Sequence, residues 1–167
     1  MIGIILGLGF QWWENLHEPW QYLAFIFVYL DIVDYWIDYG PSLKKFPPKR
    51  ELDVFLDLII CFSLFLYIYA TQFSIAYFFL AFMLIKIFDS FWLLSSKLEY
   101  KPKDFDKKFV DTWIGINIIE VIATGALIAL TLLTPISSLA ILMVYIVIRL
   151  ISRIIASAKY KKIYLTN

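Results

Sequence analysis

Four long apolar stretches constrain this chain more than any other feature of its sequence. They cover residues 51–71, 73–95, 109–133 and 136–158. Each has roughly the 20 residues that an α-helix needs to cross the hydrocarbon core of a bilayer. The chain is 62% hydrophobic, and a water-soluble fold of 167 residues could not bury that much apolar surface. The sequence therefore predicts an integral membrane protein.

A fifth segment, residues 19–39, is almost as apolar but contains acids. It begins at Pro19, a residue favoured in the first turn of a helix, and Gly40 and Pro41 are predicted to end it. No segment alternates as a strand of a membrane β-barrel does. We therefore predict an all-α bundle of about five spans, with residues 1–167 as one membrane domain. Residues 1–18 are too short to span and are predicted to form an interfacial segment.

Basic residues occur in alternate connections between these segments. They are Lys44, Lys45, Lys49 and Arg50 in the first, Lys97, Lys101, Lys103, Lys107 and Lys108 in the third, and Lys159, Lys161 and Lys162 in the tail. The connections near residues 72 and 134 have none. Because positive loops remain in the cytoplasm, this pattern predicts a multi-pass protein of the cell membrane, with the N-terminus outside and the C-terminus cytoplasmic.

The two internal basic loops also resemble each other in sequence. "FPPKRELDVFLD" (46–57) aligns without gaps with "YKPKDFDKKFVD" (100–111), so that Asp57 matches Asp111. With one gap, Asp34 matches Asp89. This indicates two parallel helix hairpins, 19–71 and 73–133, followed by a final helix, 136–158, with a basic tail. The alternative is chance, because loops with prolines and lysines arise easily at membrane surfaces.

The segment "YLDIVDYWIDYG" (29–40) places Asp31, Asp34 and Asp38 on one helix face. An uncompensated charge at the centre of a membrane helix costs roughly 2.5–3.5 kcal/mol on insertion scales. We therefore expect this face to point into the bundle, with Lys86, Arg149 and Arg153 as partners. The alternative is a purely structural layer of ion pairs, with the charges nearest the interface in contact with water.

Glu120 lies deepest of all the acids, with Asn117 one turn before it. An ionisable side chain at this depth is a functional-site candidate by default, although a structural hydrogen bond is an alternative. The predicted ion pathway or buried charge network comprises Asp31, Asp34, Lys86, Asp89, Asp111, Asn117, Glu120, Arg149 and Arg153.

Other kinds of site have weak or no support in the sequence. Glu14, His17 and Glu18 have helical spacing and are weak candidates for a metal site, because a single histidine is a poor signal. No cofactor is expected, since no phosphate-binding loop or Cys/His cluster is present. A net charge of only +1 argues against nucleic acid as a partner.

Three classes of function follow from these patterns. Transport of cations or protons, including channel activity, is the favoured one. The first alternative is an accessory or assembly subunit of a larger membrane complex. The second is a membrane enzyme that uses Asp31 and Asp34 to bind a divalent metal. The expected partners are the lipid bilayer and either further copies of this chain or other membrane subunits.

Overall fold

The structure is a computed structural model that describes residues 2–159, so the predicted cytoplasmic Lys161 and Lys162 lie outside the described residues. Within this part the regular elements are all helices, as predicted. The elements in order are α1 (Ile2–Phe10), the 3₁₀ helix η1 (Gln11–Asn15), α2 (Pro19–Lys45), α3 (Glu51–Tyr69), the 3₁₀ helix η2 (Ala70–Gln72), α4 (Ile75–Tyr100), α5 (Asp104–Leu133) and α6 (Ser138–Lys159).

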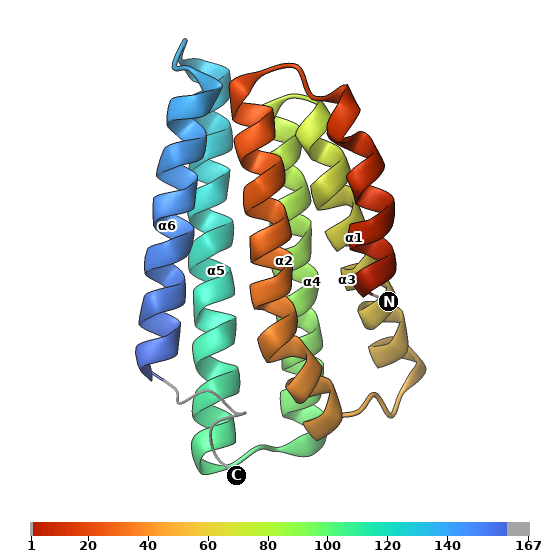
Figure 1. The fold of residues 1–167 in the computed structure, drawn as a ribbon. Helices are drawn as coiled ribbons and strands as arrows, with labels where there is room; N and C mark the ends of the chain where they lie inside the picture. The colour runs from red at the N-terminus through yellow and green to blue at the C-terminus, as the bar shows by residue number, and fades with distance from the viewer. Residues whose placement is uncertain (1, 160–167) are drawn as a thin grey trace.

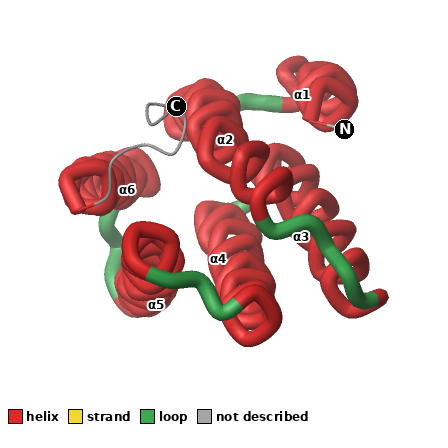
Figure 2. Tube along the Cα trace, turned by 90° about the horizontal axis from the view of Figure 1, so that it is seen from below, coloured by secondary structure: helices red, strands yellow, loops and turns green. Residues whose placement is uncertain are grey.

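Helices α2 to α6 run up and down in one bundle (Figure 1). Viewed along the helices, α4 lies in the middle, with α3 and α5 on its two sides (Figure 2). Helix α6 packs on α5, and α2 lies across the remaining side. Aromatic side chains fill the centre, where Phe78, Phe79 and Phe82 of α4 surround Tyr145 of α6.

Four helices are long and apolar enough to cross a membrane: α3 extended by η2, α4, α5 and α6. Their outer faces expose large apolar side chains such as Phe62, Ile122 and Ile154, which suit contact with lipid. Helix α2 is not among the four, although its 27 residues give it a length of about 40 Å at 1.5 Å per residue. Its aspartates and terminal lysines lower its mean hydropathy. The prediction that α2 is a fifth span therefore depends on its packing against the other helices and not on its composition.

The predicted end of this helix at Gly40 and Pro41 is wrong, because α2 continues to Lys45. A proline inside a helix lacks the N–H that would bond to the carbonyl four residues earlier, and Figure 1 shows the last turns of α2 bending away. In those turns the Ser42 hydroxyl donates to the Asp38 carbonyl oxygen (2.8 Å), a bond that often accompanies a helix bend. Lys44 and Lys45 interact favourably with the negative end of the helix dipole.

Helix α1 lies beside α3 and reaches about half the height of the bundle (Figure 1). Gly9 allows this close approach, because a Cβ there would lie 2.9 Å from Cδ1 of Ile68. The Tyr29 hydroxyl of α2 donates to the Leu6 carbonyl oxygen (2.7 Å). The segment predicted to be interfacial is therefore packed against the helix bundle.

The α2–α3 and α4–α5 connections lie at the same end of the bundle (Figure 1). Lys45 and Asp106 link them through an ion pair of 2.5 Å. The two predicted hairpins thus run in the same direction, but their matched acids have different surroundings. Asp57 accepts a hydrogen bond from Tyr39 (2.5 Å), whereas the exposed Asp111 pairs with Lys97 (2.6 Å). The internal repeat stays a prediction.

Candidate functional site: a buried charge network

Two arginines of α6, one helical turn apart, bind the three aspartates of α2. Arg149 Nε donates to Asp31 Oδ1 at 2.8 Å. Arg153 Nε lies 2.7 Å from Asp34 Oδ2, and its Nη1 donates to Asp38 Oδ2. Arginine suits this arrangement because one planar guanidinium can serve two carboxylates. The acidic face of α2 therefore points to α6, as its sequence predicts.

Glu120 of α5 joins this row of ion pairs to α4. Its Oε1 accepts from Arg149 Nη1 at 2.9 Å, and its Oε2 lies 2.9 Å from Lys86 Nζ. The Glu120 side chain is 1% exposed and that of Lys86 is 4% exposed. Two cations thus contact one deeply buried carboxylate. Such a carboxylate is held as an ion.

Asp89 has a different environment from the other acids. It is completely buried, and both of its oxygens accept hydrogen bonds from neutral groups. The Tyr35 hydroxyl donates to Oδ1 at 2.9 Å, and Asn117 Nδ2 donates to Oδ2 at 2.7 Å. No basic side chain in the described part of the chain lies within ion-pair distance of its carboxyl group.

The network is not balanced in charge if every acid is ionised. Its described members include five carboxyl groups, Asp31, Asp34, Asp38, Asp89 and Glu120, but only three basic groups, Lys86, Arg149 and Arg153. Uncompensated charge is very unfavourable away from water. Asp34 is partly exposed and can contact water, but Asp31, Asp89 and Glu120 are deeper and outnumber Lys86 and Arg149 by one. Among the five acids, Asp89 is the one without an ion pair to a described residue.

Only small cavities adjoin this network. One of about 20 Å³ is lined by Tyr35, Lys86, Asn117 and Arg149, among others, and one of about 10 Å³ lies beside Asp31 and Tyr67. A single water needs roughly 10–15 Å³ by this kind of measure. The larger cavity therefore has room for about one water, which would suit the buried Asn117 Oδ1, an atom without a protein partner among the described residues.

The structure brings together all but one of the predicted network residues. Asp111 is the exception, because it lies near the start of α5 and pairs with Lys97 outside the network. Sequence reasoning missed Tyr35, whose hydroxyl donates to Asp89, and the buried pair of Tyr67 and Tyr145 beside the network. Tyr35 follows Asp31 by four residues and so shares its helix face, a spacing that could have revealed it.

The weak metal candidates Glu14, His17 and Glu18 do not assemble into a site. Among the described residues no group of three His, Cys, Asp or Glu side chains could hold a metal ion. Glu18 instead accepts a hydrogen bond from Trp20 Nε1 (2.7 Å) and precedes the first turn of α2. Asp31 and Asp34, the acids of the metal-enzyme hypothesis, already bind arginines.

The fold and this site define a helical membrane bundle with a buried charge network. No family model, curated protein or solved structure matches the chain. Any function must therefore be argued from the network itself.

The pairing pattern predicts an asymmetric rescue of the Arg149→Met variant. Loss of Arg149 leaves Asp31 without a cation, whereas Glu120 retains Lys86. We expect Arg149→Met to lower the free energy of unfolding by about 3–5 kcal/mol, as for other broken buried pairs. Adding Asp31→Asn should recover part of that loss. Adding Glu120→Gln should not, because it removes the partner of Lys86. Thermal unfolding in detergent measures the stability of the single variant and of the two double variants. Equal recovery of stability by Asp31→Asn and by Glu120→Gln would contradict the pairing.

Proposed function

We propose that this protein moves protons across a membrane and that Asp89 is the side chain that binds them. The observation that supports this most is the environment of Asp89, a completely buried carboxyl group with only neutral hydrogen-bond donors in a network with excess acid. A proton on Asp89 supplies part of the missing positive charge. Intramembrane carboxyl groups serve this role in many pumps and transporters.

The size of the cavities favours protons over larger ions. A hydrated metal cation needs a wide aqueous route or a set of oxygen ligands that replaces its water shell. The cavities beside the network have room for about one water. Protons need no such space, because they pass between hydrogen-bonded groups. Lys86, Arg149 and Arg153 also line the larger cavity, and these charges would repel a metal cation.

The proposed route begins at the basic end of the bundle. Asp34 and Arg153 are partly exposed there, with side-chain exposures of 36% and 21%. From them the network continues through Arg149 to Glu120 and Lys86, and Asp89 lies one helical turn after Lys86 on α4. Beyond this level Tyr67 and Tyr145 form a buried polar pair, with their hydroxyl oxygens 2.5 Å apart. The tyrosine pair is the narrow point of the proposed route.

The second candidate is an accessory subunit of a membrane complex. It is favoured by the complete pairing of Lys86, Arg149 and Arg153 with acids, since a network that only stabilises helix packing needs nothing more. The segments 19–30, 58–85 and 121–148 also contain no Asp, Glu, Lys or Arg. A proton would therefore cross the outer half without any charged group.

The proposal includes five spans with the basic end in the cytoplasm. Its support is that both basic loops lie at one end of the bundle (Figure 1) and that α2 pairs with α6 along its length. Single cysteines at positions 45, 72, 103 and 134, in a Cys61→Ser background, test this arrangement. Positions 45 and 103 should be labelled only from the cytoplasmic side, and positions 72 and 134 only from outside. Labelling of positions 45 and 72 from the same side would refute five spans.

The Asp89→Asn variant tests the proton-binding role. Asparagine keeps the size of the side chain and still accepts a hydrogen bond, but it cannot bind a proton. We expect Asp89→Asn to fold and to lose at least about tenfold in proton flux, an ordinary range for removal of a proton-transfer group. The measurement is the pH change inside proteoliposomes under an imposed membrane potential.

Asp111→Asn is the matched control, because Asp111 lies on the neighbouring helix but outside the network. Its flux should equal that of the unchanged protein. Infrared spectra should also show a protonated carboxyl band that Asp89→Asn removes. A folded Asp89→Asn protein with unchanged flux would rule out the role of Asp89. Absence of flux in the unchanged protein, together with co-purifying membrane subunits, would favour the accessory-subunit candidate.

A further inference from the structure

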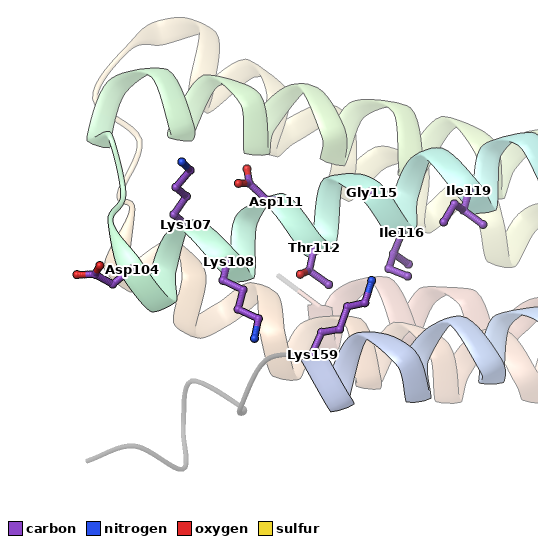
Figure 3. Close-up of a pocket in the computed structure, with 9 residues that line it drawn as sticks. All are labelled: Asp104, Lys107, Lys108, Asp111, Thr112, Gly115, Ile116, Ile119 and Lys159. Atoms are coloured by element: carbon purple, nitrogen blue, oxygen red, sulfur yellow. The ribbon is translucent and has the colours of Figure 1, made fainter.

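A groove of about 630 Å³ lies where α5 begins and α6 ends, away from the charge network. Its lining combines polar residues near the helix ends with Gly115, Ile116 and Ile119 farther along α5. Figure 3 shows the side chains of Lys108 and Thr112 on α5 and Lys159 on α6 extending into the space between the two helices. Because α5 and α6 are antiparallel neighbours, Lys108 and Lys159 meet at one level, close to the end of the bundle.

The two lysines provide positive charge that no acid of the described chain neutralises. Both are exposed, and neither forms an ion pair with a described residue. The groove also contains Asp104 and Asp111, but neither carboxylate lies between the helices. Asp111 pairs with Lys97 of α4 (2.6 Å), and Asp104 points away from the groove at the start of α5 (Figure 3).

The other end of the groove is apolar and open. A Cβ built on Gly115 would meet nothing within 4 Å, so the surface is hollow there, and Ile119 beyond it is 56% exposed. From Lys108 to Ile119 the helix rises about 16 Å at 1.5 Å per residue. The groove therefore runs from basic groups at the end of the bundle to an apolar surface inside the membrane.

We propose that this groove binds an anionic phospholipid. The phosphate contacts the ammonium groups of Lys108 and Lys159 and the hydroxyl of Thr112, and an acyl chain lies over Gly115 and Ile119. Basic pockets between membrane helices recognise lipid headgroups through this combination of charge and apolar surface. Zwitterionic lipids share the phosphate, but their choline group brings a positive charge close to the two lysines. The inference is independent of any proton transport.

Native mass spectrometry of the purified protein with phosphatidylglycerol or phosphatidylcholine tests the proposal. The unchanged protein should retain phosphatidylglycerol in preference to phosphatidylcholine. The Lys108→Gln/Lys159→Gln variant should bind phosphatidylglycerol about tenfold more weakly, as expected for the loss of two charges near a lipid surface. The matched control is Lys44→Gln/Lys103→Gln. It removes two exposed lysines from the same end of the bundle, outside the groove, and should leave retention unchanged.

A second pair of variants tests the groove without changing its charge. Gly115→Leu fills the hollow, and Gly125→Leu places the same side chain over equally open space farther along α5. Both replace a glycine inside a helix and so should not weaken the helix. Only Gly115→Leu should reduce phosphatidylglycerol retention. Equal retention of the two lipids by the unchanged protein, an equal loss in the lysine control, or equal behaviour of the two leucine variants would overturn the proposal.

Discussion

The ion pairs between α2 and α6 determine how α2 is held against the rest of the bundle. Without them α2 would expose three aspartates to lipid, at roughly 2.5–3.5 kcal/mol for each one near the helix centre. Exposure of Arg149 and Arg153 of α6 to lipid would have a similar cost. One helical turn separates the two arginines, and about one turn separates each of the three aspartates from the next, so both arginines can be paired at once. The pairs therefore fix which face of α2 points to α6.

The buried polar groups lie in layers that have different surroundings. Asp34 and Arg153 are partly exposed and paired. Deeper in the bundle, Glu120 lies between two cations, which leaves it no need for a proton. Asp89 accepts hydrogen bonds from the neutral side chains of Tyr35 and Asn117 and has no ion pair within the described part of the chain. The same residue type can therefore serve as a structural ion in one place and as a proton site in another. This difference in surroundings distinguishes Asp89 from Glu120. Glu120 was the first candidate in the sequence analysis because it lies deepest in the predicted membrane spans.

The sequence predicted the elements of the fold well because membrane helices must be long and apolar. The apolar stretches near 51–71 and 109–133 correspond to α3 and α5, and the face of α2 with Asp31 and Asp34 points to arginines. Two features needed coordinates. The continuation of α2 past Pro41 was not predicted, because a proline more often ends a helix than lies inside it. Tyr35 could have been found from its position on the face of Asp31, but its bond to Asp89 and that of Asn117 join different helices through neutral groups, which have no charge to indicate a pair.

Hydrogen exchange tests most directly whether the arginines of α6 hold α2 in place. The experiment compares the unchanged protein with an Arg149→Met/Arg153→Met variant in the same detergent, and mass spectrometry follows peptides from each helix. Amides of α2 should exchange more than about tenfold faster in the variant, because local opening of α2 becomes more favourable. Amides of α4 and α5, which pack closely on each other, should change little. Unchanged protection of α2, or an equal loss in all helices, would contradict the account.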